Sequence, residues 1–403
     1  MNASGGSRPA LLVLSSTYPR WDGDHEPGFV HELSKRLAAR FDVIALVPSS
    51  PGALPREVLD GVEIVRYRYA PRRYETLVNA GGIVTNLRRQ PWKWLLVPSF
   101  LFAQYVRAAL ILRQRQRFAI HAHWLIPQGV IAALLSVFST HAPRLVVTSH
   151  GADLFALRGR AFAHLRAWVV GRADEVTVVS DAMRENLERA GVDVRKVSVQ
   201  PMGVDLRDRF APDATTQRSR AEILFVGRLV EKKGLRHLLD AMPSIIALHS
   251  EAVLTIAGFG PEEASLRAHS DALGLADRVR FLGAVPQSRL PALYRRAAAF
   301  VAPFVEAKSG DQEGFGLVLV EALGCGCPVI ASDLPATRST LSSVHGAIGV
   351  PPGDSDALAV AIGTVLADPE SFAARAAADR ESLLERYDWS PVADRYAATL
   401  RGQ

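Results

Sequence analysis

Short, mostly apolar runs recur along both halves of the chain. In the first half they are residues 11–14, 43–47, 119–123, 144–148 and 175–179, and in the second half 223–226, 253–256, 279–282, 299–302 and 328–331. The segments between them have helical periodicity, for example residues 29–40. Apolar strands that alternate with helices are typical of a parallel sheet covered on both faces. The pattern therefore predicts an α/β protein with two similar halves.

A polar stretch with an internal proline, residues 207–220, separates the two series of strands. We therefore predict a first domain at 1–206, a linker at 207–220 and a second domain at 221–386. Residues 387–403 form a tail with a helical pattern.

Composition fits a two-domain protein with few covalent constraints. With 403 residues, of which 48% are hydrophobic, the chain can bury two ordinary cores. The N-terminus lacks a basic-then-apolar signal pattern, and the two cysteines are Cys325 and Cys327, so we expect a reducing cytoplasm. A Cys-x-Cys pair with no further cysteine or nearby histidine pair favours two small core residues over a metal site.

The segment Glu313–Glu321 carries the first candidate chemistry. It runs from a predicted strand through a polar loop and a glycine turn into an apolar helix, with carboxylates eight residues apart. This order directs the N–H groups of Phe315, Gly316 and Leu317 and the positive end of the helix dipole toward an anion. A diphosphate with a sugar on one side and a ribose on the other fits; an ordinary strand–helix unit is the alternative.

A second candidate segment, residues 223–235, lies upstream. Arg228 and Lys233 follow an apolar strand and stand five residues apart on the turn that opens the next helix. Because ligands of doubly wound sheets bind at the carboxyl ends of the strands, two cations there could neutralise a diphosphate without a metal. Neither a Gly-x-Gly-x-x-Gly after the first strand nor a P-loop motif is present, which argues against a dehydrogenase and a P-loop enzyme.

With these two motifs in this order, the chain resembles the retaining glycosyltransferases of family 4, from about Leu11 to Trp389. The other matching segments are 150–153, 201–205, 257–261, 281–285 and 324–329. The resemblance implies a GT-B fold: two Rossmann-like domains that face each other across a central cleft, with a C-terminal helix, 387–403, that crosses back to the N-terminal domain. It implies an acceptor site in the first domain and a nucleotide-sugar site in the second.

The resemblance also implies roles for single residues. Glu313 would contact the donor sugar near its anomeric carbon and Glu321 the ribose. Arg228 and Lys233 would hold the diphosphate, His150 would contact the outer hydroxyls of the sugar, and the backbone near Gly260 and Val285 would contact the nucleotide. Many family members have a glycine pair in the first loop; this chain has a single candidate there, Gly23. A glutamate that many members place after the Cys-Pro-Val segment is not evident around Leu334–Thr337 either.

The implied reaction is transfer of a sugar from a UDP- or GDP-sugar to a lipid-linked, glycan or polysaccharide-precursor acceptor, with retention and without a metal cofactor. The residues leave two other classes open: a nucleotide-sugar-binding module without catalysis, and a hydrolase or epimerase with the same fold. Asp22 and Asp24 mimic a metal-binding Asp-x-Asp, but Arg228 and Lys233 would take the place of the metal. His121 and His123 share one strand face, which by itself makes a weak metal site.

Residues 66–117 concentrate arginine and aromatic side chains. The apolar stretch within them, 94–106, is too short to span a bilayer and contains Pro98. A basic, aromatic and amphipathic surface can contact anionic headgroups, so a peripheral position on the inner face of the cell membrane is one prediction and a solvated basic helix face is the other. No nucleic-acid-binding motif accompanies the basic residues, and we expect no nucleic-acid partner.

Overall fold

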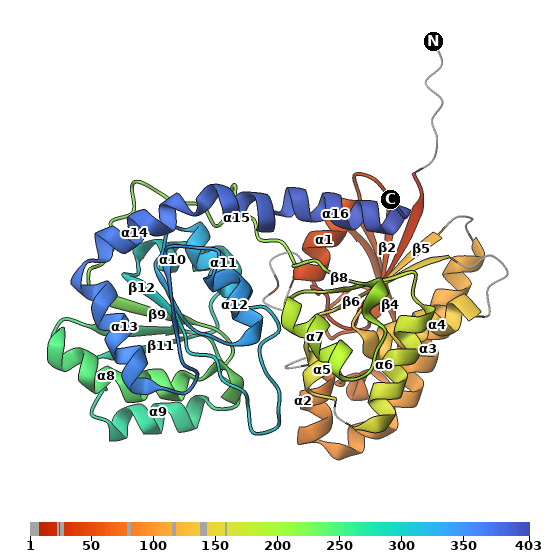
Figure 1. Cartoon of the computed structure of the whole chain (residues 1–403). Helices are drawn as coiled ribbons and strands as arrows, with labels where there is room; N and C mark the ends of the chain where they lie inside the picture. The colour runs from red at the N-terminus through yellow and green to blue at the C-terminus, as the bar shows by residue number, and fades with distance from the viewer. Residues whose placement is uncertain are drawn as a thin grey trace, which may run out of the picture. The chain divides into compact units, whose positions relative to one another are not determined.

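The computed structural model describes residues 8–21, 24, 28–78, 82–114, 118–137, 143–157 and 159–403. They form two compact units, each built around its own sheet (Figure 1). The first unit comprises Met1–Val179, Met183–Pro201 and Val392–Gln403, and the second comprises Ser180–Ala182 and Met202–Pro391. The last helix, α16 (Trp389–Arg401), begins in the second unit and belongs to the first from Val392 onward.

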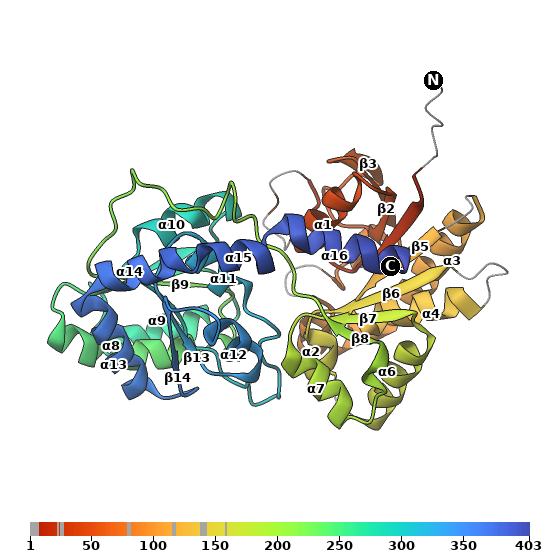
Figure 2. The ribbon, with the colours of Figure 1, turned by 45° about the horizontal axis from the view of Figure 1, so that its top comes forward.

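The first unit contains an eight-stranded sheet of order β3-β4-β2-β1-β5-β6-β7-β8. Its strands are β1 (Ala10–Leu14), β2 (Asp42–Pro48), β3 (Arg56–Leu59), β4 (Val62–Tyr67), β5 (Phe118–His123), β6 (Arg144–Ser149), β7 (Glu175–Val178) and β8 (Val197–Val199). Each pairs in parallel with its neighbours except β3, which is antiparallel to β4. Figure 2 shows β6, β7 and β8 side by side at one end of this sheet.

Helices cover this sheet as the alternating pattern predicted. They are α1 (Phe29–Leu37), α2 (Gly82–Arg89), α3 (Leu96–Gln114), α4 (Val130–Val137), α5 (Ala152–Phe155), α6 (Arg160–Arg172) and α7 (Asp181–Arg189), with short turns at Arg72–Tyr74, Pro91–Leu95, Leu125–Gly129 and Val194–Lys196. Helix α1 packs on β2, α3 on β2 and β4, and α4 on β6. Thr399 ties α16 to the sheet, since its carbonyl oxygen accepts from Arg144 at 2.7 Å and its hydroxyl from Gln200 at 2.9 Å.

The second unit contains a six-stranded parallel sheet of order β11-β10-β9-β12-β13-β14. Its strands are β9 (Glu222–Val226), β10 (Val253–Ala257), β11 (Val279–Gly283), β12 (Ala299–Ala302), β13 (Val329–Ser332) and β14 (Ala347–Val350). Its helices are α8 (Leu235–Leu248), α9 (Glu263–Ala272), α10 (Leu290–Arg296), α11 (Leu317–Gly324), α12 (Pro335–Leu341), α13 (Ser355–Ala367), α14 (Pro369–Ala378) and α15 (Arg380–Tyr387). Single turns at Glu231–Lys233 and Gln287–Arg289 precede α8 and α10.

Each sheet has one point where the strand order reverses. In the second unit the chain builds outward from β9 to β11 and then places β12 on the other side of β9. In the first unit the corresponding change lies between β1 and β5. Loops that follow the two strands of such a pair diverge and leave a crevice at the carboxyl edge, where ligands of open α/β sheets bind.

The segment 207–220, expected as a linker, lies inside the second unit. The Arg218 guanidinium donates to the carbonyl oxygens of Tyr294 at 3.2 Å, Ala297 at 2.6 Å and Gly326 at 2.9 Å. Phe210 is buried. Polar composition suggested a solvated linker, but one arginine with several donors fixes the segment to the unit. The chain leaves the first unit at 201/202 instead.

Candidate functional site

Lys233 and Glu313 form an ion pair across the reversal point of the second sheet. Lys233 ends the turn after β9, and Glu313 lies in the loop after β12. The Lys233 Nζ donates to Glu313 Oε2 at 2.8 Å, and the two side chains are 14% and 17% exposed. The ammonium also lies 4.4 Å from the centroid of the Phe304 ring. The structure thus joins two residues that the sequence predicted from separate motifs.

Two glycines allow these loops to approach so closely. Gly234 has φ +66°, and a Cβ there would lie 1.7 Å from the carbonyl oxygen of Pro303. Gly316 has φ +82° and precedes the first residue of α11, where a Cβ would meet the Leu319 side chain at 2.4 Å. Only glycine adopts such angles without strain, so both positions exclude a side chain.

The surroundings of Glu313 keep its carboxylate ionised. Burial by itself would raise the pKa, but the charges of Lys233 and Lys232 and hydrogen bonds from Lys233 and the Gly316 N–H hold the pKa at about 2. A carboxylate with such a pKa is a poor proton acceptor near neutral pH. The Gly316 N–H was expected to bind a leaving diphosphate; in this structure it donates to Glu313, the nearest anion at the helix terminus.

Glu321 has the opposite electrostatic environment. It is buried on α11, and burial raises its pKa to about 7 against the hydrogen bond from Tyr294 and the charges of Arg209 and Lys233. The Tyr294 hydroxyl donates to Glu321 Oε2 at 3.0 Å. Tyr294 was not predicted from the sequence, because it lies on α10 and no local pattern relates it to α11.

The remaining candidates of the second unit follow neighbouring strands. Arg228 is partly buried in the turn after β9, Gly260 lies in the loop after β10, and Val285 comes two residues after β11. A Cβ on Gly260 would lie 2.3 Å from the carbonyl oxygen of Leu229, so these loops are in direct contact. Since β11, β10, β9 and β12 are adjacent, all expected donor-site residues of this unit follow the carboxyl ends of neighbouring strands.

In the first unit, His150 lies among aromatic rings directly after β6. Its ring centroid is 4.8 Å from that of Phe29 and 5.2 Å from that of Trp124. His123, the last residue of β5, stacks on it with centroids 5.2 Å apart and planes 12° apart. His123 Nδ1 and His150 Nε2 share a hydrogen bond of 2.9 Å.

The histidines of this cluster are neutral. Burial lowers the pKa of His121 and His150 to about 3 and that of His123 well below its usual value. Among the described residues His123 Nε2 has no partner. An unpaired buried N–H is rarer than an unpaired acceptor, which favours a proton on His123 Nδ1. His150 then accepts at Nε2 and carries its own proton on Nδ1, as a hydrogen-bond donor. The sequence suggested at most a weak metal site at His121 and His123; His123 instead orients His150.

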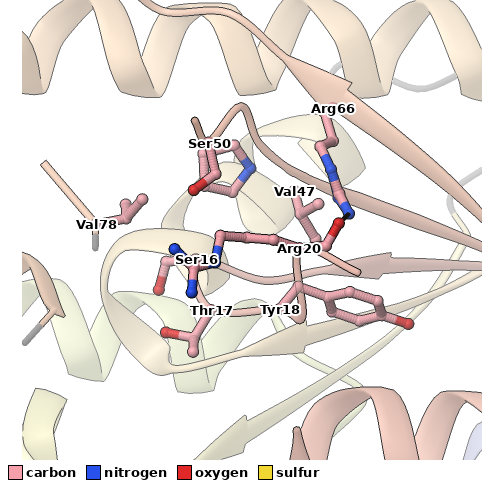
Figure 3. A pocket seen from close by; sticks show the side chains of 9 residues that line it. Ser16, Thr17, Tyr18, Arg20, Val47, Ser50, Arg66 and Val78 are labelled. Atoms are coloured by element: carbon pink, nitrogen blue, oxygen red, sulfur yellow. Dashed lines mark hydrogen bonds between the residues drawn. The ribbon is translucent and has the colours of Figure 1, made fainter. Parts of the chain in front are cut away.

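Part of the first loop of this unit, including the candidates Asp22 and Gly23, lies outside the residues that the structure describes. The side chain of Asp24 is fully buried, and its carboxylate accepts from the Arg20 guanidinium at 2.6 and 2.8 Å. A cavity of about 20 Å³, enough for one water molecule or hydroxyl group, opens beside this loop (Figure 3). Its lining includes Ser50 and Arg66, whose Oγ and Nε have no partner among the described residues.

No group of three or more His, Cys, Asp or Glu side chains suited to a metal ion occurs within the described ranges. The Cys325 and Cys327 thiols are both buried, and burial raises their pKa to about 12 and about 11. The prediction that they are core residues is confirmed.

Comparison with known proteins identifies the family. The model of Glycosyltransferase Family 4 matches residues 29–208, and that of Glycosyl transferases group 1 matches residues 207–381. The phosphatidyl-myo-inositol mannosyltransferase of Mycolicibacterium smegmatis is 30% identical over 91% of this chain and 88% of its own length. The chain belongs to glycosyltransferase family 4. It is an enzyme, a glycosyltransferase of the EC 2.4 class, as the resemblance predicted.

Other similarities agree with this assignment. A glycogen synthase of Mycobacterium tuberculosis is 27% identical over 98% of this chain and 95% of its own length. Sucrose-phosphate synthase from Thermosynechococcus elongatus superimposes with a TM-score of 0.77 at 23% identity, covering 98% of this chain and 99% of the other. Anabaena HepE in complex with UDP-glucose gives a TM-score of 0.72 at 19% identity, over 98% and 100%. The predicted GT-B fold is confirmed.

Proposed function

We propose that this glycosyltransferase moves a sugar from a UDP- or GDP-sugar to a lipid-linked or glycan acceptor, with retention of anomeric configuration and without a metal. The observation that carries the proposal is the Lys233–Glu313 pair at the reversal point of the second sheet, with Arg228 in the same turn after β9 as Lys233. In this pair the Lys233 ammonium can stabilise the negative charge of a leaving phosphate, and the ionised Glu313 carboxylate can stabilise the positive charge that develops on the sugar.

The leaving diphosphate gains negative charge as the glycosidic bond breaks. In this proposal Arg228 and Lys233 bind its oxygens, and the N–H groups of Phe315 and Leu317 at the start of α11 add the helix dipole. These fixed charges supply the stabilisation that a divalent cation provides in other transferases. The backbone near Gly260 and Val285 contacts the nucleotide, and Glu321 accepts from the ribose hydroxyls.

The transfer step is a front-side displacement. The bond between the anomeric carbon and the phosphate oxygen breaks, the acceptor oxygen bonds to the same face of that carbon, and the acceptor proton moves to the departing phosphate. Glu313 is too weak a base for this proton, because its pKa is about 2. Its charge instead stabilises the positive sugar ring. His150, neutral and protonated on Nδ1, donates to an outer hydroxyl of the sugar.

The named substrates of relatives support the substrate classes. One relative, 32% identical over 65% of this chain and 71% of its own length, is a GDP-mannose-dependent mannosyltransferase acting on a phosphatidylinositol monomannoside. The HepE structures contain UDP and glucose or UDP-glucose. A lipid-linked acceptor in envelope or exopolysaccharide synthesis would place this enzyme in the cytoplasm, at the inner face of the cell membrane. The cavity beside the first loop is a candidate contact for an acceptor hydroxyl.

The test is to incubate the purified protein with UDP- and GDP-sugars, with and without a lipid fraction from the cell. Nucleotide release is followed, and the product is analysed by mass spectrometry and by NMR of its anomeric proton. Release that depends on the acceptor, with the donor's anomeric configuration kept in the product, supports the proposal. Glu313→Gln, which keeps the side-chain shape and removes the charge, should release far less nucleotide.

The alternatives give different results in the same assay. Release that does not depend on an acceptor indicates a hydrolase, and a changed donor sugar without release indicates an epimerase. Nucleotide-sugar binding without any product indicates a binding module. Inversion at the anomeric carbon would overturn the front-side displacement but leave the transferase assignment intact.

A further inference from the structure

Helix α3 has apolar residues on two opposite faces. One face is part of the core: Phe100 and Ala108 are fully buried, and the helix packs on β2, β4 and α4. The other face is exposed, with Leu95, just before α3, and Phe102 81% and 69% accessible. We use the name α3 ridge for the exposed large apolar residues of this helix and the turn before it: Trp92, Trp94, Leu95, Phe102, Val106 and Leu110.

The ridge follows the helical repeat. Phe102, Val106 and Leu110 are spaced four residues apart and lie on one side of α3. A helix on the surface of a soluble domain normally has polar side chains at such positions, and an apolar stripe there marks a contact with an apolar partner.

The apolar character of α3 is not that of a transmembrane segment. By length and composition alone, Pro91–Gln114 is a continuous helical segment among the described residues that could cross a membrane. Yet Phe100, Gln104 and Ala108 are buried in the first unit, so one face of the helix is not accessible to lipid. The helix can lie in the plane of an interface, with its ridge toward the acyl chains.

Charge around the ridge selects the kind of partner. Between Ile64 and Ala152 the sequence contains one carboxylate, Glu75, and it is buried and paired with Arg68 at 3.3 Å. Within the same stretch, the exposed arginines that the structure describes are Arg68, Arg72, Arg73, Arg88, Arg89, Arg107 and Arg113. The Arg73 guanidinium lies 4.7 Å from the Tyr74 ring centroid, which in turn is 6.1 Å from that of Trp92. Cations and interfacial aromatic rings therefore meet at the N-terminal end of the ridge.

We propose that the first unit docks on an anionic bilayer by inserting the α3 ridge, with the arginines at its N-terminal end on the headgroups. The role of this contact in catalysis rests on the proposed lipid-linked acceptor, but the contact itself does not. An anionic bilayer offers both an apolar layer and a negative surface. This matches a ridge of Trp, Phe and Leu within a stretch of the chain that is rich in arginine and has a single carboxylate.

One expected member of the basic surface does not belong to it. Lys93 is buried, and its Nζ donates to the carbonyl oxygen of Thr76 at 2.8 Å. It anchors the start of the ridge to the segment that leads to Val78, which lines the cavity beside the first loop.

The experiment is co-sedimentation of the full-length protein with vesicles of phosphatidylglycerol and phosphatidylcholine, and with phosphatidylcholine vesicles. It is run at about 0.1 and 0.5 M salt, since charge contacts are screened over about 10 Å at the lower concentration and about 4 Å at the higher. The parent should bind the anionic vesicles and retain a salt-resistant fraction. This separates insertion from purely electrostatic adsorption, which high salt removes.

Two variants divide these contributions. Leu95→Ser with Phe102→Ser should lower the partition coefficient at high salt by roughly tenfold or more, because burying one such side chain alone is worth about that factor. Arg88→Glu with Arg89→Glu should lower binding mainly at low salt. All four side chains are exposed, so the fold should persist, as circular dichroism and UDP or GDP binding by the second unit would verify.

Matched controls change the same side-chain types elsewhere. Val58→Ser with Leu248→Ser removes two exposed apolar side chains outside the ridge, and Arg172→Glu with Arg189→Glu reverses two exposed charges of the first unit. The apolar control should reduce vesicle binding less than the Leu95/Phe102 variant does, and the charge control less than the Arg88/Arg89 variant does.

The outcomes are distinct. A ridge variant that sediments with anionic vesicles as well as the parent does would overturn the proposal. So would a parent that stays in the supernatant, or a ridge that instead holds two copies together, seen as a dimer that the Leu95/Phe102 variant dissociates. Nucleotide release with a water-soluble acceptor tests the proposed function separately, because no bilayer is involved.

Discussion

Replacing Lys233 by methionine tests the central pair of the proposed donor site. Methionine keeps most of the side-chain volume and removes the charge. The pKa of Glu313 is about 2, against an ordinary value of 4.5, and this difference corresponds to about 3 kcal/mol of stabilisation of the carboxylate, part of it from Lys232. Exposed cations on a turn usually contribute little to folding stability. Lys233 differs, because its ammonium is largely buried and its loss leaves a buried carboxylate without its main partner.

We therefore expect Lys233→Met to destabilise the second unit by about 2–3 kcal/mol at pH 7. Lys233→Met with Glu313→Gln should restore much of this stability, because it also removes the unpaired charge. Glu313 has a depressed pKa, so its contribution is fully present above pH 4.5 and is lost as the pH falls toward 2. The deficit of the single variant should shrink over that range. Turnover should fall by roughly two to four orders of magnitude in both variants, mainly in kcat.

The assay is a double-mutant cycle on the parent, the two single variants and the double variant. Urea unfolding is followed by hydrogen exchange of peptides from residues 223–248 and 317–331, which report on the second unit alone. Kinetics with a soluble acceptor are measured in parallel. A coupling energy below about 0.5 kcal/mol would refute the argument that the pair is desolvated and mutually stabilising. Near-normal turnover of Lys233→Met would remove Lys233 from the stabilisation of the leaving group.

Three further predictions concern other groups. Arg228→Ala should lower turnover by roughly two to four orders of magnitude with little change in the urea midpoint, and a variant with parental kcat would show that Arg228 does not bind the leaving phosphate. Activity should survive EDTA; complete loss that manganese or magnesium restores would redirect attention to the aspartates of the first loop. Because burial holds the pKa of His121 and His150 at about 3, the unfolded chain binds protons below pH 6.5 that the folded unit does not. The first unit should therefore lose about 2 kcal/mol per histidine between pH 6.5 and 5, measured by urea unfolding, and a pH-independent midpoint would contradict the neutral cluster.

The sequence predicted the central strands well and the edge strands poorly. Strands such as β1 and β9 are buried along their whole length, so they appear as apolar runs. The hairpin β3–β4 was not predicted. The edge strand β3 has only partly or fully exposed residues and lacks an apolar run, and Glu63 and Arg66 interrupt the apolar residues of β4, although β4 lies inside the sheet. The edge strands β8 and β14 were missed for the same reason.

For the candidate site, sequence motifs singled out residues that follow the carboxyl ends of neighbouring strands, but not how these residues pair. Lys233 and Glu313 are 80 residues apart, and only the β9–β12 neighbourhood brings them together. The role of His123 depends on a stacked contact with a residue from the next strand, which no spacing along β5 reveals. Lys93 belongs to the basic stretch 66–117, yet its side chain is buried and its Nζ donates to the carbonyl oxygen of Thr76. Long-range pairing and burial are set by tertiary packing, and a single sequence carries little information on either.

The two glutamates of the proposed donor motif show how packing gives two similar side chains opposite pKa shifts. Glu313 and Glu321 stand eight residues apart in the same loop–helix segment, yet the pKa of one is about 2 and that of the other about 7. At neutral pH the first is charged and its charge is balanced by Lys233, whereas burial favours the neutral form of the second. The site therefore adds little negative charge against an incoming diphosphate. Lys233 already neutralises Glu313, so a bound phosphate would make the Lys233 ammonium share its hydrogen bonds between two anions. The Glu313 carboxylate would then become available to the sugar of the proposed nucleotide-sugar donor.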